Sequence, residues 1–305
     1  FDGEKFKNYD LGPEHGFFDF LKWRFTKDKI PWPNYVELPK RKNDIINRSN
    51  KPVITFINHA TFLIQTDQLN ILTDPIFSER TSPVTWAGPK RVIDPAISLE
   101  ELPKIDLIII SHDHYDHLDL ATLRYLKKRD NPLIYAGLEV GRVDRSLEIN
   151  ELKWWQEINT PNFQLTFTPC QHFSGRTLFD RNESLWGGFF FKSRSLSFYF
   201  AGDTGYSNHF KQVKKRFSNI DVAFLPIGAY EPRWFMKQMH INPEEAIIAH
   251  QDLSPKISFG MHWGTFQLTD EGRMEPVTGI ISLSKEKNIN NFKVLDFGEQ
   301  FEFQK

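Results

Sequence analysis

Short runs of apolar and β-branched residues recur along the 305-residue chain from Val53 onward. Such runs are typical of β-strands, and several are too apolar to expose either face. We predict strands at Val53–Ile57, Thr61–Gln65, Asn70–Leu72, Leu107–Ile110, Gln164–Thr168, Ser197–Phe200, Val222–Leu225 and Ile257–Met261. Strands of this kind indicate sheets that are covered on both sides by other layers.

Segments with the apolar spacing of helices separate these strands. We predict helices at Leu120–Lys128, Phe210–Phe217, Pro243–Gln251 and Val277–Lys287. The third begins with proline and two glutamates, an order that helix starts favour. Because sheets buried on both faces need helices outside them, we expect an α/β fold with layers ordered helix, sheet, sheet, helix.

No internal repeat or low-complexity stretch divides the chain, so we expect one folded domain over residues 51–305, preceded by an arm over residues 1–50. The arm mixes apolar and cationic side chains, namely Phe17, Phe18, Phe20, Leu21, Lys22, Trp23, Arg24, Phe25 and Lys27. An arm of this kind can lie on a lipid surface. The alternative is an arm packed over the domain, which the lack of one clean apolar stripe favours.

Composition restricts the partners and the compartment only in part. A formal net charge of −1 provides no global field for nucleic acid, so we expect no nucleic-acid partner. The single cysteine, Cys170, cannot form an internal disulfide, which fits a reducing compartment without proving one. No apolar run approaches the roughly 18 residues of a membrane-spanning helix. We expect a soluble or peripheral membrane protein, cytoplasmic or periplasmic, and a targeting segment could precede Phe1.

The richest group of candidate metal ligands follows the predicted strand Leu107–Ile110. It reads Ser111-His112-Asp113-His114-Tyr115-Asp116-His117 and leads directly into a predicted helix. Imidazole nitrogen and carboxylate oxygen are the usual zinc ligands other than thiolate, and a tight turn brings alternate side chains into one cavity. A chance match to His-x-His-x-Asp-His in such a chain arises roughly once in a thousand or less. The box therefore predicts a metal site.

Three further candidates also follow predicted strands. They are His172, Asp203 and His262. A single histidine is more often a hydrogen-bonded structural residue than a metal ligand. Here the recurrence at strand ends favours one shared site that collects all three residues.

The box followed by separate His, Asp and His resembles the metallo-β-lactamase superfamily. Finer segments resemble its N-acylphosphatidylethanolamine-hydrolysing phospholipase D family: Leu-Thr-Asp74-Pro-Ile-Phe-Ser, Ala-Gly-Pro-Lys-Arg91, Phe-Ala-Gly-Asp203-Thr-Gly-Tyr, Gly-Ala-Tyr230-Glu-Pro-Arg-Trp-Phe-Met, His240-Ile-Asn-Pro-Glu-Glu-Ala and Met-His262-Trp-Gly-Thr-Phe. The similarity extends from about Pro52 to Glu302, and the arm adds the short matches Phe6-Lys-Asn and Trp32-Pro.

This resemblance implies the metallo-β-lactamase fold, a four-layer αβ/βα sandwich, with two Zn²⁺ per chain. It assigns His112, His114 and His172 to the first zinc. It assigns Asp116, His117 and His262 to the second zinc, and Asp203 to both. A shared carboxylate suits ions about 3.5–4 Å apart, as in two-metal hydrolases. Iron or manganese suit the same donors, so the residues alone leave the metal open.

Outside the ligand set, Asp74 and Asp119 are candidates for orienting the ligand histidines, and for Asp119 a plain helix N-cap is the alternative. His59 either points into the cleft or is a turn histidine. The family pattern places a substrate-side residue at His240, with helix capping as the alternative, and has glutamine where this chain has Met239. Three further histidines are expected to be ordinary: His15, His209 and His250.

The activity that the resemblance implies is hydrolysis of a phospholipid phosphodiester, giving phosphatidic acid and an N-acylethanolamine. Water activated by the metals attacks phosphorus in line, and the candidate catalytic residues are Asp203, His240 and Asp74. The same ligand set also suits hydrolysis of another ester, a lactone, an amide or a nucleic-acid phosphodiester. An iron redox centre and a metal- or lipid-binding module without turnover are further alternatives. Headgroup, acyl chain and oligomeric state stay open.

Overall fold

Two seven-stranded mixed sheets form the centre of the molecule. The computed structural model describes residues 5–10, 16–25, 29–40, 44–177 and 179–304. The first sheet contains β1 (Val53–Asn58), β2 (Thr61–Thr66), β3 (Leu69–Thr73), β4 (Leu107–Ile109), β5 (Leu133–Gly137), β6 (Asn150–Leu152) and β14 (Gln300–Glu302), in the order β14-β1-β2-β3-β4-β5-β6. The second contains β7 (Glu157–Asn159), β8 (Gln164–Thr168), β9 (Gly188–Lys192), β10 (Ser197–Phe200), β11 (Val222–Pro226), β12 (Ile257–Met261) and β13 (Phe292–Lys293), in the order β13-β12-β11-β10-β9-β8-β7.

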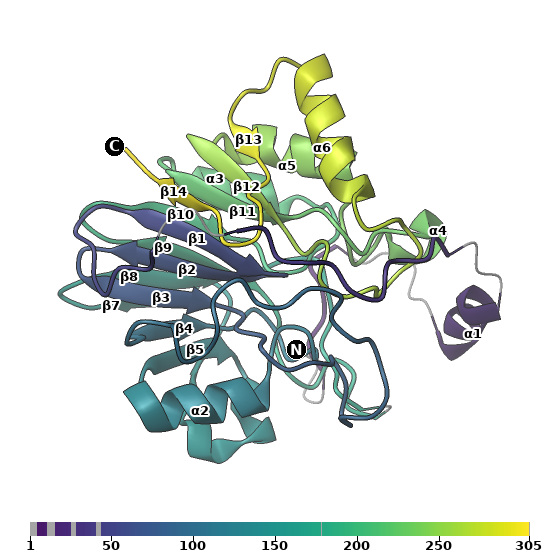
Figure 1. Ribbon diagram of the computed structural model, residues 1–305, viewed down its shortest axis with the longest axis horizontal. Coiled ribbons are helices and arrows are strands. Elements are labelled where there is room, and N and C mark those ends of the chain that lie inside the picture. The colour runs from purple at the N-terminus through teal and green to yellow at the C-terminus, as the bar shows by residue number, and fades with distance from the viewer. Residues whose placement is uncertain (1–4, 11–15, 26–28, 41–43, 178, 305) are drawn as a thin grey trace.

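Helices cover the outer faces of both sheets (Figure 1). The α-helices are α1 (Phe17–Phe25), α2 (Leu120–Asp130), α3 (His209–Arg216), α4 (Arg233–Met236), α5 (Pro243–Leu253) and α6 (Glu275–Glu286), with short 3₁₀ helices η1 (Val140–Val143) and η2 (Arg145–Leu147). Helix α2 lies against the first sheet, whereas α3, α5 and α6 lie on the side of the second. The expected order helix, sheet, sheet, helix is confirmed.

The faces of the strands explain this layering. Between the sheets the core is largely phenylalanine, and Phe62 of β2 meets Phe224 of β11 with ring centroids 4.6 Å apart. On the opposite face of the first sheet, Leu63 packs in a separate apolar cluster with Leu123 and Leu126 of α2. Burial of alternate side chains on opposite faces makes both sides of the sheet apolar.

All predicted strands and helices are present, with ends that differ by no more than two residues. Helix α5 begins as predicted at Pro243, and Asn242 and Glu245 form a reciprocal capping box there. The prediction missed the strands β5, β6, β7, β9, β13 and β14. Most of these are short or lie at sheet edges, where few positions need to be apolar.

The described part of residues 5–40 includes the helix α1, which the sequence pattern did not predict. Trp23 anchors this helix, since its Nε1 donates to Asp270 Oδ2 at 2.8 Å and its ring stacks on Phe235 of α4. Phe18 and Phe25 are more than four-fifths exposed. His15 and Lys27 lie outside the described residues, as do the side chains of Phe17, Phe20 and Arg24.

Among the described residues, no helix combines the length and apolarity needed to cross a membrane.

Candidate metal centre

The carboxyl ends of parallel strands bring the chemical groups to one edge of the sandwich. Asp74 follows β3, the box of histidines follows β4, Asp203 follows β10 and His262 follows β12. Strands β3, β4 and β5 are parallel in one sheet, and β10, β11 and β12 are parallel in the other. The loops after parallel strands leave at the same edge, where α/β proteins bind their ligands.

Three of the predicted ligands form a first group. His112 Nε2 lies 2.8 Å from His114 Nδ1, and His172 Nε2 lies 3.3 Å from the same atom. Burial lowers the pKa of His114 to about 4 and that of His172 to about 3. Burial also holds the pKa of His112 well below its usual value. At neutral pH the three rings are therefore uncharged, and their nitrogens lie within 4.8 Å of one another.

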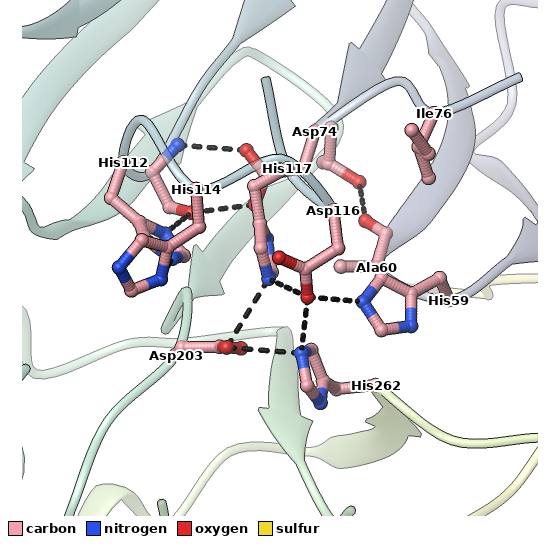
Figure 2. Close-up of polar contacts among 12 residues, drawn as sticks. His59, Ala60, Asp74, Ile76, His112, His114, Asp116, His117, Asp203 and His262 are labelled. Carbon is pink, nitrogen blue, oxygen red and sulfur yellow. Dashed lines mark hydrogen bonds and ion pairs between the residues drawn. The ribbon is translucent and has the colours of Figure 1, made fainter. Parts of the chain in front are cut away.

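The other predicted ligands form a second group around two carboxylates (Figure 2). Asp116 Oδ2 lies 3.3 Å from His117 Nε2 and 3.2 Å from His262 Nε2. Asp203 Oδ2 lies 3.2 Å from the same nitrogen of His117 and 3.0 Å from that of His262. All four residues are buried.

Asp203 also adjoins the first group. Its carboxylate, His172 and His240 offer ligand atoms that lie within 4.8 Å of one another. Its Oδ1 has no hydrogen-bond partner among the described residues. The carboxylate thus lies between the two groups, with one oxygen on the second group and another that is buried and unpaired.

The electrostatics of both groups suit a cation. Burial alone would lower the pKa of His262, but Asp203 and Asp116 raise it to about 9. The same two carboxylates hold the pKa of His117 well above its usual value, against the effect of burial. Positive charge is therefore favoured in the second group, while the first group offers neutral nitrogen lone pairs. The donors and their spacing fit the metal-binding role predicted for them.

One buried carboxylate, Asp74, orients histidines of both groups. Its Oδ2 accepts from His117 Nδ1 at 2.7 Å and from Ser111 Oγ at 2.6 Å. The single hydroxyl proton of Ser111 goes to Asp74. Ser111 Oγ therefore acts as an acceptor toward His112 Nδ1, which lies 2.9 Å away. These contacts use Nδ1 of both rings and leave Nε2 as the atom that faces the site, which is the orientation that a metal ligand requires. Asp74 thus lies where the sequence predicted an orienting residue.

The ring of His172 is oriented by a backbone carbonyl instead. Its Nδ1 donates to Met239 O at 2.8 Å, which leaves Nε2 for a metal. The side chain at position 239 does not make this contact. Replacement of the glutamine of the family pattern by Met239 therefore leaves this part of the site unaffected.

The predicted orienting role of Asp119 is wrong. Its carboxylate caps α2 through the N–H groups of Ala121 and Thr122 and also accepts from the N–H groups of Phe77 and Ser78. Among the described residues it has no hydrogen bond to a ligand histidine. The reason is local: a carboxylate at the N-cap is used by the unpaired donors of the first helical turn.

His59 points into the site. Its Nε2 lies 2.9 Å from Asp116 Oδ2, and its ring centroid lies 4.1 Å from that of His262. Its carbonyl accepts from the backbone N–H of His262 at 2.7 Å. Both residues have positive φ, 47° and 62°, a conformation that is uncommon outside glycine and clusters at functional sites.

A glycine allows the loop of Asp203 to approach the histidine box closely. Gly202 has φ 64°, and a Cβ built on it would lie 2.7 Å from Ser111 Cβ. No real Cβ atom tolerates that approach to a buried side chain, so only glycine fits.

His240 lies at the border of the site, with a 12% exposed side chain. Its Nδ1 lies 3.7 Å from Asp203 Oδ2 and has no hydrogen-bond partner among the described residues. Arg233 holds the backbone here, because its Nη1 donates to His240 O at 2.8 Å while its Nη2 pairs with Glu245. The alternative of helix capping for His240 is wrong, since the neighbouring helix α5 is capped by Asn242.

The remaining histidines that the structure describes lie outside both groups. His209 contacts the hydroxyls of Ser207 and Thr204, and His250 contacts Ser258 and Asn291. Ser111 was not among the predicted site residues, and its only signal in the sequence is its position directly before the box.

A family model for the β-lactamase superfamily domain matches residues 69–263. The chain is 36% identical over 267 residues to N-acyl-phosphatidylethanolamine-hydrolyzing phospholipase D 1 of Caenorhabditis elegans, covering 81% of this chain and 75% of that protein. It is 39% identical over 218 residues to the mitochondrial enzyme of the same name in Saccharomyces cerevisiae, covering 68% of this chain and 46% of the yeast protein.

Among solved structures, an isothiocyanate hydrolase from Delia radicum gut bacteria aligns with a TM-score of 0.65. The alignment covers 82% of this chain and 99% of that one, at 21% identity. At this identity the likeness concerns the fold alone, and it agrees with the layers described above.

Proposed function

Since the chain belongs to the metallo-β-lactamase superfamily and, within it, to the family of N-acylphosphatidylethanolamine-hydrolysing phospholipases D, we propose that it is a dinuclear zinc hydrolase of phospholipids. It cleaves the headgroup-side phosphodiester bond, and N-acylphosphatidylethanolamine is the proposed substrate. The observation that carries this proposal is the convergence of two donor groups on Asp203.

The residues would provide two metal positions. His112, His114 and His172 would hold the first, and Asp116, His117 and His262 would hold the second. Asp203 lies between the groups and could contribute to both. Zinc bound at these positions would supply an activated water molecule and positive charge near the phosphate. An iron-loaded site is the alternative. Metal analysis and an absorption spectrum of freshly purified protein distinguish a zinc-loaded site from an iron-loaded one.

His240 is proposed to bind the substrate. Burial lowers its pKa to about 3, so its ring is neutral at pH 7. A neutral ring is a poor proton source, and we therefore assign it a hydrogen bond to the phosphodiester in place of protonation of the leaving group. Its unpaired Nδ1 near Asp203 suits this role.

The test of the substrate is mass spectrometry of products formed from mixed membrane phospholipids in oxygen-18 water. Phosphatidic acid carrying the label is expected, because water attacks phosphorus. Label in a free fatty acid would mean carboxylic ester hydrolysis. Turnover of lactones or RNA without turnover of phospholipid would favour the other hydrolases of the superfamily. Retained lipid binding with no turnover in zinc-replete buffer would leave a binding module. Asp203→Asn, with a matched melting temperature, is the control for contaminating lipases.

Contact with a bilayer through α1 forms part of the proposal. The exposed rings of Phe18 and Phe25 lie on the helix that Trp23 attaches to α4, four residues before His240. Exposed apolar rings on a helix that also carries cationic side chains suit a lipid interface. Replacing both by alanine should lower activity on bilayers more than on short-chain soluble lipid. The control is Ile281→Ala, an exposed apolar residue on α6. Equal losses on both substrates would favour a purely packed arm.

A further inference from the structure

Residues 5–10, at the start of the described chain, lie against the metal centre. Phe6 is buried in the main core, and its N–H donates to Asn182 O at 2.8 Å. Tyr9 packs its ring 4.8 Å from that of Trp154. Further along, Asp10 O accepts from Gln171 Nε2 at 3.0 Å. The segment is thus docked by contacts on both sides of Asn8.

The side chain of Asn8 makes a two-point contact with the backbone of His172. Asn8 Nδ2 donates to His172 O at 2.8 Å, and Asn8 Oδ1 accepts from His172 N–H at 3.1 Å. The same oxygen accepts from Trp186 Nε1 at 3.1 Å. An amide side chain can pair in this way with both backbone groups of one residue because it carries a donor and an acceptor side by side.

The contact is important because the backbone N–H and C=O of His172 have no hydrogen bond to other backbone groups of the described residues. The residue is 1% exposed, so its N–H and C=O cannot turn to bulk water. Loss of the Asn8 side chain would leave the buried N–H and C=O of His172 unpaired, and each would then bear its desolvation penalty without a compensating hydrogen bond. Movement of the loop is the simplest way to relieve that cost.

Such movement would displace one specific metal ligand. His172 is the only member of the first group that comes from the second sheet, whereas His112 and His114 come from the box. Met239 O orients its ring and Asn8 holds its backbone, so the two contacts together determine where Nε2 lies. The second group has no contact with Asn8 among the described residues.

We propose that Asn8 is a positioning residue for His172, so that the first metal position is complete only when residues 5–10 are docked. The inference rests on the metal centre of the proposed function. It also places the role of this segment at the metal and not at a lipid surface.

The test is titration of the metal-free, full chain with Zn²⁺ and with Co²⁺, whose visible absorption reports ligand geometry. Asn8→Ala should weaken one metal position about 10–100-fold, the usual effect of losing an outer contact of a ligand. The other position should change less than about twofold. Two reference variants identify the affected position. The Co²⁺ absorption band that changes in Asn8→Ala should be the band that His172→Ala loses and that His262→Ala retains. Activity should recover with excess zinc, which a merely unfolded variant would not allow.

Two further variants separate the amide contact from general loosening of the segment. Tyr9→Ala removes the neighbouring ring contact without touching His172, and it should bind both metals as the wild type does. Asn8→Asp keeps an acceptor for His172 N–H but sets a carboxylate oxygen against His172 O, so it should weaken the same metal position at least as much as Asn8→Ala. If Asn8→Ala does not fold, Asn8→Asp carries the same test.

Unchanged affinity at both positions in Asn8→Ala, or equal weakening of both positions, would overturn the inference. Equal effects of Tyr9→Ala and Asn8→Ala would also overturn it. Failure of the wild type to bind metal would instead refute the proposed function, because no variant is involved in that measurement.

Discussion

Replacement of Asp74 by asparagine should weaken both metal positions while leaving the fold intact. In the wild type, Asp74 Oδ2 accepts from His117 directly and from Ser111, which in turn accepts from His112. An asparagine Nδ2 at this place can only donate. Each ring then accepts at Nδ1 and carries its proton on Nε2, the atom that binds metal.

The structure also sets the expected magnitudes. Loss of the hydrogen-bond partner behind a ligand histidine costs about 10–100-fold in metal affinity, which is about 1.4–2.8 kcal/mol at 1.4 kcal/mol per factor of ten. We expect the upper end for the second position, because Asp74 contacts His117 directly. The lower end is expected for the first, because the effect reaches His112 through Ser111. The fold should survive, since Ser111 N–H still has an amide oxygen to pair with at the place of Oδ1.

Competition titrations with a chromophoric chelator measure both affinities, and thermal melting of the metal-free protein measures the fold. Ser111→Ala is the matched control: it interrupts only the path to His112, so only the first position should weaken. Nitrogen NMR of the histidine rings in the metal-free protein reports the tautomers. Affinities within twofold of wild type in Asp74→Asn would refute the reasoning, as would a collapse of the fold.

Three more predictions concern the same centre. Asp203→Asn should lower metal occupancy and activity together, because a negative charge near both positions is lost; unchanged zinc content by elemental analysis would contradict this. Metal affinity of the second position should rise with pH up to about 9, because the raised pKa values of His117 and His262 mean that protons must be displaced below that pH. The first position, whose histidines have lowered pKa values, should bind without proton release above about pH 5; calorimetry in buffers of different ionisation enthalpy distinguishes the two. His240→Ala should raise KM or alter headgroup preference while both metals stay bound, and steady-state kinetics with lipids of different headgroups checks it.

The linear pattern was sufficient for most interior strands, with β5 and β9 as the exceptions, and for the four main helices. Burial on both faces requires continuous apolar runs, and helix packing requires a 3.6-residue period. Edge strands such as β13 and the helix α1 carry no such requirement, since one side or one end meets solvent. Their formation depends on what lies beside them. Trp23 shows this, because its partner Asp270 is remote in the sequence.

The candidate ligands could be selected from the sequence because coordination demands particular residue types, and strand ends concentrate them. The contacts that orient those residues could not be predicted from the sequence in the same way. Ser111 is one hydroxyl among many in the sequence, Met239 acts through a carbonyl that every residue has, and Asn8 reaches its partner across 164 residues. Asp74 directly follows a strand and Asp119 directly precedes a helix, so the sequence made both candidates for the same role. In the structure Asp74 orients histidines, whereas Asp119 caps the helix.

By itself, then, the sequence determined the layers of the sandwich and the chemical types gathered at its edge, because both follow from local periodicity and from donor chemistry. The tertiary structure alone decided which nitrogen of each histidine faces the centre of the site. It also decided which carboxylate lies between the two groups, and that Asn8 pairs with the backbone of His172. Those outcomes depend on distances between segments far apart in the chain, and no local pattern encodes such distances.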